Sequence, residues 1–143
     1  RSAKDSRAEI INGPWGHQIA YAIQGETRSF PGLSAADQGA WSTSYPTRAL
    51  FPLMALVKGV RDSKLEDFHS PILMLYSEQD QTIDPQQAKA AFARLGSTNK
   101  LLQAVDYSES KGQHVLAGDL RAPKATAPMA ETIIHWVKTL PNT

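Results

Sequence analysis

The chain has no cysteine among its 143 residues. Disulfide bonds, thiol nucleophiles and cysteine-ligated metal sites are therefore excluded. Long apolar runs are missing too: the longest, residues 49–57, contains Pro52 and is far shorter than the roughly 20 residues that a membrane-spanning helix needs. Residues 1–5 are polar and lack the apolar core of a signal peptide. These absences leave the cellular compartment open.

An excess of charge of either sign is also absent. Fifteen Lys and Arg against 14 Asp and Glu give a formal net charge of +1, and the charges are scattered along the chain. We therefore expect neither a nucleic acid nor an anionic membrane surface as a partner. No two histidines have the i, i+4 spacing of a zinc site, and we expect no metal or organic cofactor. The length and the 41% share of hydrophobic residues are typical of an ordinary globular domain.

A short apolar run, Ile72–Tyr76, is the clearest feature that the chain does contain. Such a run predicts a strand buried on both faces of a parallel sheet. Beyond a polar loop, Asp84 offers a helix cap, Pro85 a first-turn proline and Gln87 an amide three residues after the cap. Gly96 is then placed to end that helix. The segment predicts a strand, an acidic loop and a helix in succession.

Residues 100–107 predict a second strand, followed by a loop over residues 108–113. The order strand, helix, strand implies a right-handed parallel crossover. A final helix is predicted to begin at Thr126 and to end at Pro141. Its expected apolar stripe is Ala130, Ile133, Ile134, Val137 and Leu140.

The first part of the chain predicts helices joined by a long loop. A short helix is expected over Trp15–Ile23, with Ile19, Ala20 and Ile23 on one side. Residues 24–46 predict a loop, interrupted by glycine and proline. Apolar spacing predicts an amphipathic helix over Thr47–Asp62, with Leu50, Leu53, Met54, Val57 and Val60 as its stripe. We therefore divide the chain into a helical segment, 1–69, and a strand-containing segment, 70–143.

Two side chains suited to acid–base chemistry follow the two predicted strands. Asp80 lies just after the first strand and His114 follows the second, so both are expected at the same edge of the sheet. A carboxylate there can accept the Nδ1–H of the imidazole, fix its tautomer and stabilise the imidazolium. We predict that Asp80 is the acid and His114 the base of a catalytic site.

Each candidate also has a simpler interpretation. The simpler interpretation of Asp80 is a turn former, and that of His114 is a loop histidine bonded to backbone, but we favour the acid and base roles. Asp84 is the rival acid, but its position before Pro85 favours a helix cap. Asp119 is best explained by a solvated turn. The other histidines, His17, His69 and His135, are expected to be non-catalytic. Several large side chains either line a ligand pocket or simply pack: Trp15, Phe30, Trp41, Tyr45 and Met54.

Several segments together resemble the last two strands and last two helices of the α/β-hydrolase fold. They are Pro71–Pro85 with Asp80 near its centre, Arg94–Ser97, Gly112–Leu116 with His114, and the amphipathic final helix. The resemblance implies that Asp80 and His114 are the acid and base of a Ser-His-Asp triad. It also implies that residues 1–69 correspond to the variable cap or lid.

The nucleophile of such a triad normally lies on a Gly-x-Ser-x-Gly turn that precedes the acid and the base. This motif does not occur in the chain. The resemblance therefore implies that the first strands, the nucleophile and the oxyanion loop belong to a missing N-terminal half. Under this hypothesis the complete protein cleaves small-molecule acyl esters, as an esterase or lipase does, and the chain alone is inactive.

Two other readings stay open. One is a non-enzymatic α/β module that binds a ligand or partner; the other is an acyltransferase or carbon–carbon hydrolase on the same fold. Because two parallel strands make a poor stand-alone sheet, we also expect the isolated chain to dimerise or to exchange strands at its exposed edge.

Overall fold

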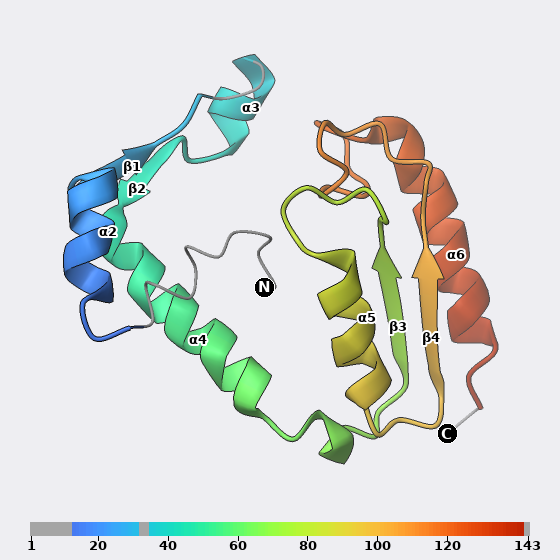
Figure 1. Cartoon of the computed structure of the whole chain (residues 1–143). Helices are drawn as coiled ribbons and strands as arrows, with labels where there is room; N and C mark the ends of the chain where they lie inside the picture. The colour runs from blue at the N-terminus through green and yellow to red at the C-terminus, as the bar shows by residue number, and fades with distance from the viewer. Residues whose placement is uncertain (1–12, 32–34, 142–143) are drawn as a thin grey trace. The chain divides into compact units, whose positions relative to one another are not determined.

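The computed structural model describes residues 13–31 and 35–141. They form two compact units, residues 13–63 and residues 64–141, which we describe separately (Figure 1). The units divide after Ser63, whereas the predicted boundary follows His69. The intervening segment belongs with the second unit because it packs on the chain near Gly96, whose N–H donates to the Leu65 carbonyl at 3.2 Å.

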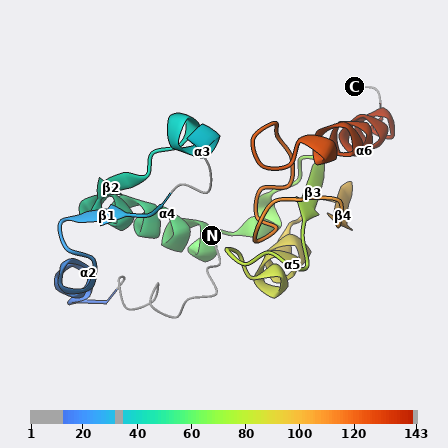
Figure 2. The same ribbon diagram turned by 90° about the horizontal axis from the view of Figure 1, so that it is seen from above.

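The second unit is built on a pair of parallel strands. Strand β3 (Ile72–Tyr76) lies beside β4 (Lys100–Ala104), with Ile72 opposite Lys100. Helix α5 (Pro85–Arg94) connects them, and α6 (Thr126–Lys138) follows. Figure 2 shows α5 and α6 on opposite faces of the pair. The predicted strand–helix–strand order is confirmed, although β4 is shorter than the predicted 100–107.

Helix α5 begins where the sequence predicts. The side chain of Asp84 accepts the N–H of Gln86 at 2.9 Å, and Pro85 is the first helical residue. Proline suits this position because its missing N–H has no partner there in any helix. Asp84 is therefore a helix cap, as its position before Pro85 predicted.

The end of α5 is explained differently from the prediction. Gly96 does follow the helix, but its φ angle is not in the left-handed region that a glycine cap uses. A Cβ atom at Gly96 would instead lie 1.8 Å from the carbonyl oxygen of Glu66. The glycine is needed because two backbone segments approach closely at this point.

The apolar faces of this unit are less buried than predicted. Every residue of β3 is only half-buried, so the expected burial on both faces is wrong. On α6, the expected burial of the apolar stripe is wrong as well: Ile133, Ile134 and Val137 are 41%, 53% and 50% exposed. The half-buried positions of that helix are Pro128, Met129, Thr132 and Trp136. A sheet of two strands is too narrow to cover the whole apolar stripe of α6. The helices packed on it in turn leave both faces of its strands half-exposed.

The first unit has a small apolar core between two helices. Helix α2 (Gly16–Gln24) contributes Ala20, and α4 (Leu50–Asp62) contributes Leu50, Met54 and Val57. Both helices are confirmed. Three residues predicted on their apolar sides are instead exposed, namely Ile19, Ile23 and Val60.

The predicted loop over residues 24–46 contains regular structure. Strands β1 (Thr27–Ser29) and β2 (Ser44–Pro46) pair in antiparallel fashion, and the segment that connects them contains a short helix, α3 (Ala35–Ala40). Buried Thr47 anchors the pair: its hydroxyl donates to the Gly25 carbonyl at 2.6 Å and its N–H to the Glu26 carbonyl at 2.8 Å. The loop prediction is therefore wrong for these residues.

Within the part of the chain that the structure describes, no helix has the length and apolar character needed to cross a membrane.

Candidate active site

Asp80 lies in a tight turn directly after β3. Its N–H donates to the Ser77 carbonyl at 3.3 Å. Its Oδ1 accepts two backbone N–H groups, from Thr82 at 2.7 Å and from Ile83 at 2.9 Å. These two bonds fix the carboxylate and leave Oδ2 to meet another partner.

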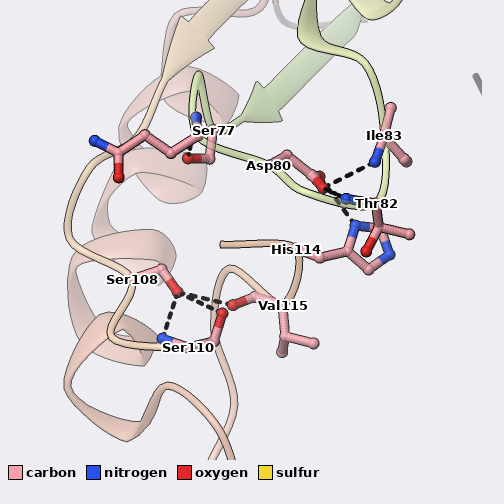
Figure 3. Close-up of polar contacts among 9 residues, drawn as sticks. Ser77, Asp80, Thr82, Ile83, Ser108, Ser110, His114 and Val115 are labelled. Atoms are coloured by element: carbon pink, nitrogen blue, oxygen red, sulfur yellow. Dashed lines mark hydrogen bonds and ion pairs between the residues drawn. The ribbon is translucent and has the colours of Figure 1, made fainter. Parts of the chain in front are cut away.

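That partner is His114. Its Nδ1 lies 2.9 Å from Oδ2 of Asp80 (Figure 3). The Asp80 side chain is 12% exposed and that of His114 42% exposed. Because a carboxylate can only accept, Nδ1 carries the proton, and in the neutral ring the lone pair lies on Nε2. None of the hydrogen bonds found among residues 13–31 and 35–141 uses Nε2, so this nitrogen is available to take a proton.

The loop before His114 reverses direction sharply. Gly112 and Gln113 have φ angles of 83° and 55°, which are left-handed conformations that glycine adopts at little cost and other residues adopt rarely. The N–H of Gln81 donates to the Gly112 carbonyl at 2.9 Å. This bond joins the loop of Asp80 to the loop of His114, and so holds the two side chains at one edge of the strand pair.

The surroundings of Asp80 act on its pKa in opposite directions. Burial raises the pKa and is the largest single influence. Hydrogen bonds from His114, Ile83 and Thr82 lower it, and together they bring the pKa of Asp80 below its usual value of 3.8. The carboxylate is therefore the form that the folded structure stabilises.

A lowered pKa predicts how Asp80 contributes to stability as pH changes. A group whose pKa is lower folded than unfolded stabilises the fold above its unfolded value, and this contribution disappears as pH falls through the folded value. We expect Asp80→Asn to lower the free energy of unfolding by about 1–2 kcal/mol near pH 7. The difference from the unmodified chain should shrink once the pH falls below about 4. Urea denaturation at several pH values measures this, and a difference that is constant down to about pH 2 would contradict it.

The remaining histidines and Asp119, which the sequence did not favour as catalytic residues, lie elsewhere. His17 stacks on Phe51 with ring centroids 3.7 Å apart. The Nδ1 of His69 lies 3.1 Å from the Gly96 carbonyl oxygen. His135 lies on the exposed side of α6, and Asp119 is exposed in a loop. No group of three or more potential metal ligands is found in the described part of the chain.

Met54 is one of the five large side chains left open between pocket lining and simple packing, and it lines a cavity. In the first unit, a cavity of about 350 Å³ includes Met54 in its lining but none of the four aromatic residues named with it. Its lining residues are Gly13, Pro14, His17, Gln18, Phe51, Met54, Ala55 and Lys58.

Two buried serines in the His114 loop, Ser108 and Ser110, were not identified from the sequence.

No protein-family model matches the chain, and no curated protein matches it. Among solved structures, it is similar to a soluble variant of monoglyceride lipase from Saccharomyces cerevisiae, determined in complex with a substrate analogue. The TM-score is 0.57 and the sequence identity 12%, over 91% of this chain and 50% of that one. The chain thus spans about half the length of that structure. The likeness shows the fold: a mixed α/β architecture consistent with part of an α/β-hydrolase.

Proposed function

We propose that this chain supplies the acid and the base of a Ser-His-Asp triad, in an α/β-hydrolase that cleaves acyl esters. The observation that carries the proposal is the 2.9 Å contact between Asp80 Oδ2 and His114 Nδ1. It is formed beyond the ends of two neighbouring parallel strands, where open α/β sheets place their reactive groups. Two backbone N–H groups fix the orientation of the carboxylate.

In the proposed reaction, Nε2 of His114 takes the proton of a serine hydroxyl while the serine oxygen attacks the ester carbonyl carbon. The imidazolium then gives this proton to the leaving alkoxide as the carbon–oxygen bond breaks. Water repeats the sequence on the acyl-enzyme: His114 takes a proton from water, hydroxide adds to the carbonyl carbon, and the serine oxygen leaves with the proton. Asp80 stays ionised, holds the ring and stabilises its charged form.

The nucleophilic serine and the oxyanion-hole donors are proposed to lie outside residues 1–143. The support is the absence of a Gly-x-Ser-x-Gly turn from the sequence and the incomplete cover of β3. The similar lipase structure has about twice the length that this chain matches. The remainder of such a fold would add strands beside β3, and the first unit, residues 13–63, would then serve as the cap.

The proposed substrate class is suggested by the same likeness. The similar structure is a monoglyceride lipase with a bound substrate analogue, so we propose a small acyl ester, such as a monoacylglycerol, as substrate. No metal or organic cofactor takes part in the proposed steps.

An esterase assay tests the proposal. Residues 1–143 alone should not hydrolyse a p-nitrophenyl ester above the rate without protein. A longer protein that includes the residues encoded before Arg1 should hydrolyse it. A fluorophosphonate should label a serine in the added residues. If the longer protein neither hydrolyses esters nor reacts with the fluorophosphonate, the site is not that of a serine hydrolase and a binding module becomes the better interpretation.

A further inference from the structure

We propose that Ser108 is a positioning residue for His114, closing the loop that presents the imidazole to Asp80. The inference rests on the proposed function only in taking His114 as the base. Ser108 is 5% exposed, and its hydrogen bonds are all internal to the His114 loop. It acts through His114 and is not expected to touch the substrate.

The central contact is between the two ends of the loop. The Ser108 hydroxyl lies 2.8 Å from the carbonyl oxygen of Val115, the residue directly after His114 (Figure 3). A carbonyl oxygen can only accept, so the single hydroxyl proton of Ser108 is committed to Val115. The backbone on the far side of His114 is therefore held to the start of its own loop.

A second serine completes the contact. The Ser110 N–H donates to the Ser108 oxygen at 3.2 Å, and the two hydroxyl oxygens also lie 3.2 Å apart. Because the Ser108 proton is used by Val115, the Ser110 hydroxyl donates to Ser108. Both serines are 5% exposed, and a buried hydroxyl that loses its partners destabilises the folded state.

The same loop carries backbone strain that these contacts hold in place. Gln113, with a φ of 55°, is in a left-handed conformation that favours glycine. Its side-chain amide donates to the Ser108 carbonyl at 2.5 Å. Ser108 thus binds on both sides of His114, through its carbonyl to Gln113 and through its hydroxyl to Val115. If these bonds are lost, holding His114 against Asp80 carries the entropic cost of ordering the loop.

The structure offers a matched control in Ser97. It is 3% exposed, and its hydroxyl donates to the Asn99 carbonyl at 3.1 Å. It lies between α5 and β4, at the opposite ends of the strands from Asp80. Ser97→Ala and Ser108→Ala therefore remove the same group from equally buried sites, but only Ser108→Ala removes bonds in the His114 loop.

NMR on the 143-residue chain tests the inference through the Nδ1–H of His114, identified by its loss in His114→Gln. In the unmodified chain this proton should exchange slowly with water because Asp80 holds it. We expect Ser108→Ala to speed its exchange at least tenfold, Ser108→Thr to restore slow exchange and Ser97→Ala to leave it unchanged. If Ser108→Ala does not fold, Ser108→Cys, a far weaker donor, takes its place with the same expectation.

The possible outcomes separate this inference from the proposed function. Slow exchange in the unmodified chain together with equally slow exchange in Ser108→Ala overturns the positioning role and leaves the Asp80–His114 pair intact. Equal acceleration by Ser97→Ala and Ser108→Ala also overturns it, because the effect would then be one of general stability. Fast exchange in the unmodified chain counts against the pair itself, and with it against both proposals.

Discussion

Asp80→Asn is expected, under the proposed function, to lower kcat for an activated ester about 10⁴-fold in the longer protein that carries the serine. The reason lies in how the side chain is held. Oδ1 accepts the N–H groups of Thr82 and Ile83, so the carbonyl oxygen of an asparagine must take that position. Its NH₂ group then faces His114 at the place of Oδ2.

An NH₂ group is a hydrogen-bond donor, so it favours the tautomer of His114 that is protonated on Nε2. It would donate to Nδ1, and the ring proton would move to Nε2. Nε2 then has no lone pair with which to take the serine proton, although the packing of the site is hardly changed. His114→Ala removes the base altogether and should lower kcat about as much. Both variants are expected to change KM far less than kcat, because neither side chain is proposed to bind the ester.

Two substitutions of the same chemical type serve as controls. Asp84→Asn makes the same change four residues further along, at the cap of α5, where asparagine caps as well as aspartate. His135→Ala removes a histidine from an exposed position on α6. Both should leave kcat within about twofold of the unmodified protein. If Asp80→Asn also stays in that range, Asp80 does not orient a catalytic base.

The second large effect is on folding, and it comes from Gly96. Gly96→Ala would place a Cβ atom 1.8 Å from the Glu66 carbonyl oxygen and 2.9 Å from Cε1 of His69. The Glu66 atom belongs to the backbone, so no side-chain rotation relieves the clash. The segment before β3 must move away, and it loses the bond between the Gly96 N–H and the Leu65 carbonyl. We expect a loss of about 3 kcal/mol or more in the free energy of unfolding.

Urea denaturation followed by circular dichroism measures this loss. Gly59→Ala is the matched control, because Gly59 lies inside helix α4 and its added Cβ would meet no atom within 4 Å. That substitution should stabilise its helix by about 0.5–1 kcal/mol, since alanine favours a helix more than glycine does. A Gly96→Ala chain with an unchanged denaturation midpoint would show that the two segments are not in close contact.

The sequence was most informative where one local rule decided the structure. The apolar run Ile72–Tyr76 predicted β3, and Asp84 followed by Pro85 predicted the start of α5. The meeting of Asp80 and His114 followed from topology alone, because parallel neighbours end at the same edge. Their catalytic role remains a prediction that the kinetic variants test.

The sequence was least informative where long-range contacts decide. Strands β1 and β2 have three residues each and show no buried face, so they carry no alternating pattern that could be recognised. Their pairing depends on backbone hydrogen bonds between distant residues, which side-chain identity does not encode. Ser108 was missed for a similar reason: a serine in a polar loop looks the same whether it is exposed or holds Val115.

The prediction that the apolar stripe of α6 is buried was wrong for a different reason. Ile133, Ile134 and Val137 have the spacing of a buried face, and periodicity correctly indicates that they belong together. What periodicity does not give is the amount of surface available to cover them. Two strands leave them exposed, in agreement with the proposal that further strands and helices complete the sheet.

The bond between the Gln81 N–H and the Gly112 carbonyl joins two loops of the same unit, residues 64–141. The carboxylate, the imidazole and all the bonds that orient them come from one strand–helix–strand crossover and the loop after it, within residues 64–141. Residues 13–63 contribute none of these bonds. Under the proposed function, in which residues 13–63 serve as the cap, variation in that unit leaves these bonds intact, so substrate preference and proton transfer would change independently.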